Sequence, residues 1–138
     1  MTMKKFISIF AITLLFAAAG CNSVPEIPTD LSYTQLIQMG QDSIEFANYK
    51  AAEAYYQTAI QRYGLNINSY IESTYELGHL YLTCKKYDKA VAKFTELQMI
   101  YEDSEAGSLP ASFKKLTAIN MERIPEKYRS AVAPETEE

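Results

Sequence analysis

Apolar side chains recur at intervals of three and four residues through most of this 138-residue chain. This spacing is typical of helices with one buried face. The pattern predicts five helices, over residues 31–46, 49–63, 69–84, 87–101 and 109–124. Short polar breaks at residues 47–48 and 85–86 separate the members of two helix pairs, and Pro125 ends the last helix. We therefore expect an all-α protein made of two antiparallel helix pairs and a final helix.

The two helix pairs are related by an internal repeat of constant offset. Five positions recur 38 residues later: Gly40 as Gly78, Tyr49 as Tyr87, Ala52 as Ala90, Tyr56 as Phe94 and Tyr63 as Tyr101. A glycine inside a helix costs about 1 kcal/mol relative to alanine, so its recurrence needs a structural reason. We expect close approach of two helices at each glycine, with Ala52 or Ala90 opposite. The aromatic residue four positions after each alanine then fills the space between neighbouring pairs.

These residues resemble the tetratricopeptide repeat, in which a helix pair carries Leu-Gly-x2-Tyr and then Ala-x3-Phe. The matching stretches are Leu77-Gly78-x2-Tyr81 with Ala90-x3-Phe94, and Met39-Gly40-x2-Ser43 with Ala52-x3-Tyr56. Neither unit opens with Trp, and a longer connection at residues 64–68 extends the period beyond the usual length of about 34 residues. Similar lengthened repeats occur in periplasmic lipoproteins that assist outer-membrane protein assembly. The resemblance implies a short solenoid with units at about 31–64 and 69–102.

The last predicted helix is expected to cap the open end of this solenoid. Its apolar side comprises Leu109, Phe113, Leu116, Ile119, Met121 and Ile124. An array this short is marginal, because about three repeats are usually needed for stability. We therefore expect homo-oligomerisation or a partner to stabilise the helical domain of residues 31–124. Residues 125–138 are expected to form a polar, acidic tail.

The chain begins with the pattern of a secretory signal peptide. Lys4 and Lys5 precede an apolar run at residues 6–19 that is shorter than the roughly 20 residues of a membrane-spanning helix. The following Ala18-Ala19-Gly20-Cys21 resembles a bacterial lipobox, which implies removal of residues 1–20 and acylation of the Cys21 thiol. The alternatives are a transmembrane anchor, or an ordinary cleavage site followed by a buried or free thiol. Two or more acyl chains would anchor the protein stably.

Residues 21–30 contain Pro25 and Pro28 and lack apolar periodicity, which predicts an extended tether. Cleavage would remove two lysines and no acid from a chain whose net charge is already −4. We therefore expect attachment to an anionic lipid surface to depend on the acyl chains. Together, the resemblances imply a lipid-anchored protein of a bacterial cell membrane that faces the periplasm.

The composition argues against catalysis and against several ligands. A single His excludes a histidine-based metal cluster, and the negative net charge gives no reason to expect nucleic acid. Acylation of Cys21 would leave Cys84 alone, so no internal disulfide would form. The chain lacks the G-x-S-x-G, P-loop, H-E-x-x-H and paired C-x-x-C motifs. We therefore predict a protein that is not an enzyme and needs no cofactor or metal.

In tetratricopeptide stacks the first helix of each pair lines the concave surface. The resemblance therefore implies groove residues Thr34, Ile37, Gln41 and Glu45 in the first unit, and Glu72, Tyr75, His79 and Leu82 in the second. Such a mixed face fits a peptide segment or a helix. The alternative is a merely solvated helix face. For His79 this means an exposed polar residue rather than a pH-sensitive contact, and Glu72 and Glu76 would be a repulsive, solvated pair.

These observations favour a scaffold or adaptor that holds an envelope protein or peptide segment near the membrane. A second hypothesis is an accessory protein or carrier, for a small apolar ligand or a transporter, because helix arrays can enclose pockets.

Overall fold

The computed structural model describes residues 23–130. Residues 1–22, which include Cys21, and the end of the chain from residue 131 lie outside the described residues, so the expectations for the signal peptide and lipidation remain predictions. The described part contains helices and no strands. The helices are α2 (Tyr33–Glu45), α3 (Tyr49–Tyr63), α4 (Ile67–Thr83), α5 (Tyr87–Glu102), α6 (Ala111–Glu122) and α7 (Glu126–Arg129).

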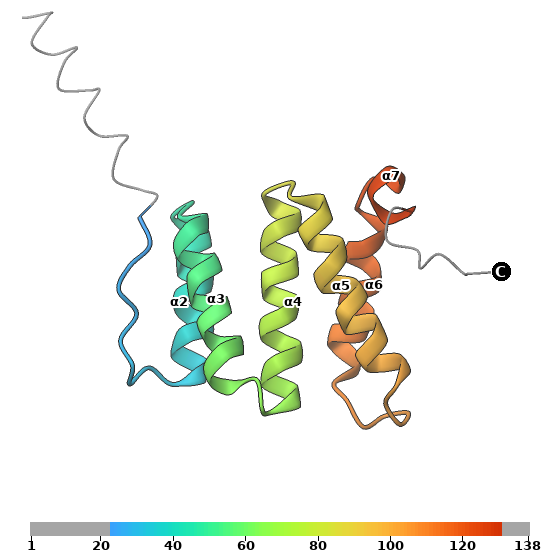
Figure 1. The fold of residues 1–138 in the computed structure, drawn as a ribbon, viewed down its shortest axis with the longest axis horizontal. Helices are drawn as coiled ribbons and strands as arrows, with labels where there is room; N and C mark the ends of the chain where they lie inside the picture. Colours follow the sequence, from blue (N-terminus) through green and yellow to red (C-terminus); the bar gives the residue numbers. More distant parts are fainter. Residues whose placement is uncertain (1–22, 131–138) are drawn as a thin grey trace, which may run out of the picture.

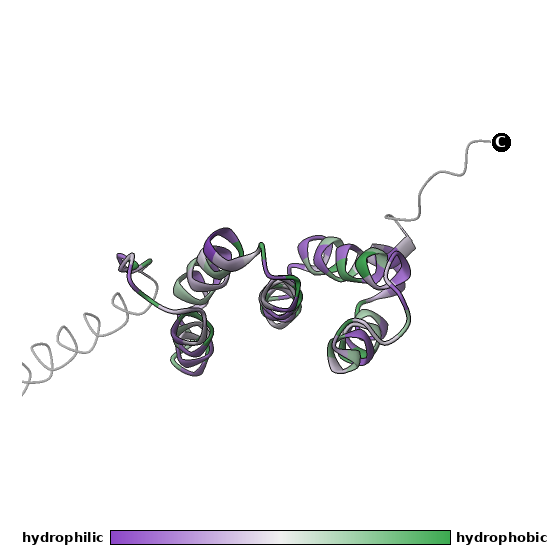
Figure 2. Ribbon diagram, turned by 90° about the horizontal axis from the view of Figure 1, so that it is seen from below, coloured by the Kyte–Doolittle hydropathy of each residue, from purple (hydrophilic) through white to green (hydrophobic). Residues whose placement is uncertain are grey.

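Successive helices run antiparallel and pack side by side (Figure 1). Helix α2 packs on α3 and α4 packs on α5, while α3 joins the two pairs by packing on α4. Seen along the helix axes, α2, α4 and α6 form a first row, and α3 and α5 form a second row (Figure 2). Because α4 is set back from α2 and α6, the helices of the first row follow a curve, and we call the inner side of this curve the concave surface. The predicted all-α, solenoid-like stack of helix pairs is confirmed.

Side-chain caps fix the starts of the first-row helices α2 and α4. Ser32 and Gln35 form a reciprocal capping box at the start of α2. Helix α4 begins at Ile67, two residues before the predicted start, because Asn66 accepts hydrogen bonds from the backbone N–H groups of Asn68 (3.0 Å) and Ser69 (3.1 Å). These bonds satisfy backbone donors that the helix itself leaves unpaired.

Each pair is closed by the same turn. Ala47 and Lys85 follow the C-caps of α2 and α4 and have φ angles of 55° and 57°, in the left-handed region. The next residue in each turn, Asn48 or Lys86, donates its backbone N–H to a carbonyl five residues earlier at 2.8 Å. This is the Schellman arrangement, which usually places glycine where this chain has Ala47 and Lys85. The 38-residue repeat therefore extends to backbone conformation.

The two repeated glycines lie where an aromatic ring meets a helix backbone. A Cβ added to Gly78 would lie 2.8 Å from Cε1 of Phe94, and one added to Gly40 would overlap the ring of Tyr56. Both rings are fully buried, as are Ala52 and Ala90 one turn earlier. The close approach expected from the sequence is therefore present, and an aromatic ring occupies the space that each glycine leaves.

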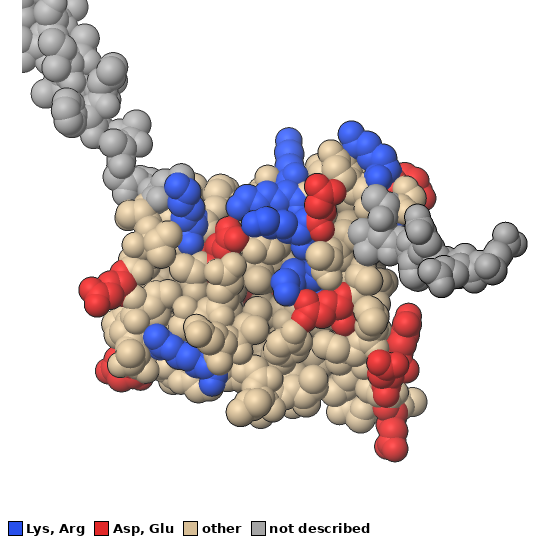
Figure 3. All heavy atoms as spheres, in the orientation of Figure 1, with Lys and Arg blue, Asp and Glu red and all other residues tan. Residues whose placement is uncertain are grey.

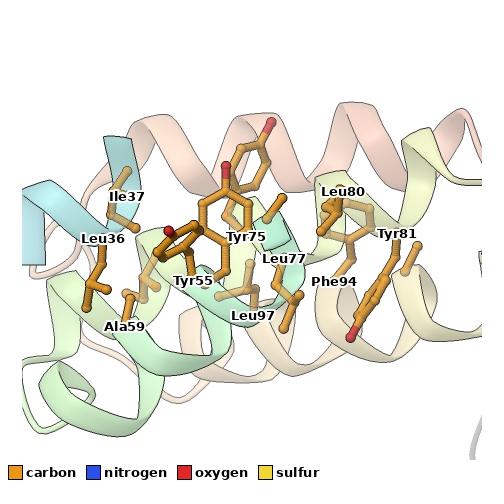
Figure 4. Close-up of a cluster of buried hydrophobic side chains, with 14 of the residues drawn as sticks. Leu36, Ile37, Tyr55, Ala59, Tyr75, Leu77, Leu80, Tyr81, Phe94 and Leu97 are labelled. Carbon is orange, nitrogen blue, oxygen red and sulfur yellow. The ribbon is translucent and has the colours of Figure 1, made fainter. Parts of the chain in front are cut away.

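The core continues from one helix pair to the next without a break (Figure 4). It consists mainly of aliphatic residues, alanines and tyrosines: Leu36, Ile37, Ala51, Ala52, Tyr55, Tyr56, Ala59, Ile71, Tyr75, Leu77, Leu80, Tyr81, Ala90, Val91, Phe94, Leu97, Tyr101 and Ile124. Ile124 reaches this core from the residues that follow α6, so the C-terminal part of the array shares the core of the two repeats.

The predicted apolar face of the last helix is partly wrong. Leu116 and Ile119 were expected to be buried, but they are 39% and 45% exposed, whereas Thr117 and Asn120 are buried at 1% and 3%. Asn120 takes its position because its amide donates a hydrogen bond to the hydroxyl of Tyr75 on α4. A side-chain hydrogen bond to another helix therefore sets the rotation of α6, and apolar spacing does not reveal such a bond.

Residues after Pro125 do not all belong to a solvated tail. The short helix α7 follows at once and packs on α5, where the rings of Tyr128 and Tyr87 lie 4.9 Å apart. The predicted tail therefore starts too early. Helix α6 is followed by a one-turn helix that covers the start of α5, so it does not end the array alone.

The segment before α2 is extended, as predicted, but it is fixed to the helices. Asn48 donates to the carbonyl of Ser23 (3.1 Å), and Arg62 donates to the carbonyls of Pro28 (2.6 Å) and Ile27 (3.3 Å). Figure 1 shows this segment (blue) running along α2 and α3 from the α2–α3 turn to the start of α2. In its described part, the predicted extended tether of residues 21–30 is therefore held against the helices by side-chain hydrogen bonds.

Candidate functional site

The surface on which sequence analysis placed a groove is the concave face of α2, α4 and α6 (Figure 2). Thr34, Gln41 and Glu45 on α2 are exposed, and Glu72, His79 and Leu82 on α4 are half-buried. These six residues are therefore at least partly open to solvent. The remaining two predicted groove residues, Ile37 and Tyr75, are only 7% and 8% exposed and belong to the core. Their assignment to the groove surface is wrong.

Tyr75 is buried because α6 covers it. Its ring packs against Phe113 of α6 at 5.4 Å and against Phe94 of α5 at 6.2 Å. Its hydroxyl accepts a hydrogen bond from the Asn120 amide at 2.8 Å. A contact with a partner at this position would require α6 to move, so Tyr75 positions α6 and is not part of the surface.

His79 lies beside the same cluster, at the border of the concave surface. Its ring stacks on Tyr75 with an interplanar angle of 14°, and its Nδ1 is 3.3 Å from the Asn120 amide nitrogen. Burial lowers the pKa of His79, and the charge of Arg123 lowers it further. Arg123 in turn donates to the Asn120 side-chain oxygen at 3.1 Å. His79 is therefore a neutral polar residue of the α4–α6 contact at neutral pH, rather than a freely exposed one.

The centre of the concave surface contains two carboxylates. Glu72 accepts a hydrogen bond from the hydroxyl of Tyr33 at 2.7 Å. Glu76 lies one turn further along α4, and burial raises its pKa. The negative charge of Glu72 adds to this increase, while the side chain of Gln41 opposes it. The pair is therefore partly desolvated between α2 and α4, which differs from the solvated pair favoured by the helical spacing alone.

Several residues of this surface were missed by sequence analysis. Tyr33 on α2 and Arg123 after α6 border it, and the buried Asn120 joins Arg123 to Tyr75 beneath it. No local motif marks these residues. Tyr33 bonds to Glu72, 39 positions away, and Asn120 bonds to Tyr75, 45 positions away. The position of Arg123 depends on how α6 is placed. The repeat register could have placed Tyr33, since Tyr33 and the buried Ile71 are 38 residues apart.

An open hollow of about 480 Å³ lies away from the concave surface, between the start of α4 and the end of α5. Tyr70, Ala92, Met99 and Ile100 give it an apolar lining, and Glu96 lies at its side, where it accepts a hydrogen bond from the Tyr70 hydroxyl. This hollow is open to solvent, so it differs from the enclosed interior that the carrier hypothesis assumed.

Within residues 23–130, no group of three His, Cys, Asp or Glu residues is placed to hold a metal ion. None of the helices in the same range is long and apolar enough to cross a bilayer. Cys84 is a free thiol at the end of α4, and burial raises its pKa, which disfavours the reactive thiolate.

The sequence is 25% identical over 124 residues to an uncharacterized protein of Treponema pallidum (strain Nichols). The alignment covers 90% of this chain and 50% of that protein, so the chain spans about half the length of the relative it matches. The sequence matches no known family in a scan of protein families, and no solved structure matches it significantly. The relationship therefore carries no function to this chain.

Proposed function

We propose that this protein is a non-catalytic, lipid-anchored scaffold of tetratricopeptide type, attached to a bacterial membrane through Cys21. Its concave surface docks a segment of another envelope protein. One observation supports this proposal. Polar side chains from α2, from α4 and from the residue after α6 are far apart in the sequence but lie together at the concave surface. Gln41 comes from α2, Glu76 and His79 come from α4, and Arg123 follows α6.

The lipid anchor would act by confinement. A protein held at the membrane surface meets membrane partners at a higher effective concentration than the same protein free in solution. Packing of the segment before α2 against Arg62 and Asn48 leaves few residues between the anchor and the domain. The concave surface would therefore stay close to the membrane, where a partner in the same membrane can reach it.

Photo-cross-linking in intact cells tests the docking surface. A photoreactive amino acid replaces Gln41 on the concave row, and in a matched control it replaces Gln61 on α3; both glutamines are exposed. We expect a discrete cross-linked species, several times more abundant from position 41 than from position 61. Equal yields from both positions, or no adduct from position 41, would contradict docking at the concave surface.

A variant in which a secretory signal with an ordinary cleavage site replaces residues 1–21 tests the contribution of the anchor to the same adduct, because its mature form has neither an acyl group nor an apolar leader. Without acylation the protein loses membrane confinement, so the yield from position 41 should fall while helicity is retained. An unchanged yield would show that the partner binds without help from the anchor, which contradicts the confinement mechanism.

The second candidate function is a carrier for a small apolar ligand, and the apolar hollow beside Tyr70 and Met99 is the observation that favours it. Native mass spectrometry of protein purified from cells distinguishes it from the scaffold. A retained small molecule that is lost on Met99→Asp, in the hollow, but not on Gln41→Asp would support the carrier. Protein that retains no small molecule would favour the scaffold.

A further inference from the structure

The edge of the domain that carries the helix turns has two unusual features. We define the turn edge as residues 23–24, 46–50, 84–89 and 125–130, which lie together at the top of Figure 1. Phe46 is 75% exposed there, Val24 is 59% exposed and Tyr49 is 38% exposed. Exposed large apolar residues gathered at one place mark a surface that binds a partner or a membrane.

The described chain also begins at this edge. The carbonyl of Ser23 accepts a hydrogen bond from Asn48 at 3.1 Å, which fixes Ser23 beside the α2–α3 turn. Consecutive Cα atoms are 3.8 Å apart, so Cys21 lies at most about 8 Å from Ser23 along the chain. The proposed acylation site is therefore tied to the same edge as Phe46 and Tyr49. The opposite edge is about 20 Å away, the length of the 13-residue helix α2.

Basic residues surround this apolar cluster. Lys50 is exposed in the first turn of α3 and Lys85 in the α4–α5 turn, and Lys86 and Lys89 lie beside Lys85 with side chains 45% and 58% exposed. Glu53 pairs with both, at 3.2 Å with Lys86 and at 3.8 Å with Lys89, so it offsets part of their charge. Figure 3 shows most of the basic side chains (blue) of this face in its upper half, with some acidic side chains (red) among them and further basic side chains at the lower left.

The opposite edge carries more exposed acidic residues, together with Arg62, Lys114 and Lys115. Asp30 precedes α2 there, and Glu102, Asp103 and Glu105 are exposed at the α5–α6 connection. Figure 3 shows acidic side chains (red) at the lower right of the molecule. Exposed Leu65 and Ile67 also lie at this edge, at the α3–α4 connection, but residues 64–68 contain no lysine. An anionic lipid surface would therefore attract the turn edge and repel the acidic connection.

From these observations we propose that the turn edge rests on the membrane, with Phe46, Tyr49 and Val24 in the interfacial layer and the lysines against anionic phospholipid headgroups. Aromatic side chains and lysines are typical of this layer. The inference rests on the proposed attachment through Cys21. The expectation that acyl chains alone hold the protein rested on the net negative charge of the whole chain. That charge is unevenly distributed, so the turn edge can attract anionic lipid although the whole chain is acidic. The helices would then stand upright on the membrane, with the concave surface open to the side.

Single-tryptophan quenching tests this orientation, because the protein contains no Trp. The full-length gene is expressed in a bacterium, and the protein is extracted from membranes and reconstituted into vesicles of phosphatidylethanolamine and phosphatidylglycerol that contain a brominated phospholipid. Phe46→Trp reports on the turn edge. Leu65→Trp, at the fully exposed position of the opposite edge, is the matched control. Both substitutions replace exposed apolar residues, and circular dichroism checks that the helices are retained.

We expect quenching at position 46 to exceed that at position 65 at least about threefold, because only an interfacial side chain meets the brominated chains. Equal quenching, or stronger quenching at position 65, would overturn the orientation. The intact mass of the same preparation shows whether Cys21 carries acyl chains. A missing acyl group would refute the proposed anchor, whereas an acylated protein with equal quenching would refute only the orientation.

Charge-reversal variants test whether the turn-edge lysines contribute to membrane contact. In the Phe46→Trp background, Lys50→Glu with Lys85→Glu should reduce quenching in anionic vesicles. Lys114→Glu with Lys115→Glu, in the first turns of α6 near the opposite edge, should leave it unchanged. Equal effects of the two pairs would contradict a specific contact between the turn-edge lysines and anionic headgroups.

Discussion

The two helix pairs share one backbone plan but differ at the turn edge. In both pairs a glycine faces a buried aromatic ring, and a left-handed residue closes the turn. The C-terminal tyrosines of the second helices both donate to a backbone carbonyl ahead of another helix, but Tyr63 bonds to Leu31 before α2 of its own pair, whereas Tyr101 bonds to Pro110 before α6. The shared contacts at the glycines and turns define what the repeat needs in order to fold.

The difference lies in what covers the start of the second helix. Tyr87 in the second pair is half-buried and packs against Tyr128 of α7. Its equivalent Tyr49 is 38% exposed, and the neighbouring Phe46 stands 75% exposed where the second pair has the half-buried Cys84. Exposed aromatic residues at this edge are therefore a property of the first pair alone, which is the pair nearest to Cys21. The repeat fold does not require them, which supports a separate role for this edge.

The largest effects on folding are expected from the two aromatic rings. Tyr56→Ala and Phe94→Ala each remove a fully buried ring and should lower the free energy of unfolding by about 3–5 kcal/mol. Exchanging one ring type for the other should change stability differently in the two pairs. The Tyr56 hydroxyl is buried without a hydrogen-bond partner among the described residues, so Tyr56→Phe should preserve or increase stability. Phe94→Tyr should cost about 1–3 kcal/mol, because it buries a new hydroxyl. Urea denaturation measures all four variants, and equal effects of the two exchanges would contradict this distinction.

Alanine at either repeated glycine should also destabilise the protein. Gly40→Ala and Gly78→Ala gain about 1 kcal/mol of helix propensity but force a buried ring to move, at a cost of about 1–3 kcal/mol. We expect a net loss at both positions that is larger for Gly40, where the ring is nearer. The exposed substitution Gln38→Ala on α2 is the control and should stay within about 0.5 kcal/mol. A gain in thermal stability for either glycine variant would show that the close approach is not needed.

Glycine in the two turns should have the opposite effect. Ala47→Gly and Lys85→Gly relieve a left-handed conformation that costs a non-glycine residue about 1 kcal/mol, so each should raise the free energy of unfolding by up to that amount. Ala54→Gly, inside α3, is the matched control and should lower it by about 1 kcal/mol. Destabilisation by Ala47→Gly or Lys85→Gly would contradict the assignment of these turns.

The smallest predicted effect is a pH dependence that belongs to the second pair. Gln41 occupies the position of His79 in the first pair and does not titrate. The pKa of His79 is lower in the folded state than its ordinary value of 6.5, so the unfolded chain binds the proton more readily. The contribution of His79 to stability is therefore present above pH 6.5 and is lost as the pH falls below that value. His79→Gln should flatten this part of the stability curve, measured by denaturation between neutral pH and pH 5. An unchanged slope would exclude His79 as its source.

The helix pairs and the glycine contacts follow from the sequence because they depend on local spacing and on an exact repeat. The end of the array does not. Apolar spacing predicted burial of Leu116 and Ile119, but the bond between Asn120 and Tyr75, 45 residues apart, sets the rotation of α6. The same contact removed Tyr75 from the predicted groove. Hydrogen bonds from Arg62 to the carbonyls of residues 27 and 28 hold the predicted extended tether against α3. Such bonds between remote residues have no local signature.

The scaffold and the upright orientation both depend on attachment through Cys21, so the most direct measurement is the intact mass of the protein extracted from bacterial membranes, with sequencing of its N-terminal peptide. The account predicts a chain that begins at Cys21 and carries a diacylglyceryl group, with Cys21→Ser leaving residues 1–20 uncleaved and the protein without lipid. A chain cut elsewhere, or one that begins at Cys21 without any added acyl mass, would contradict it.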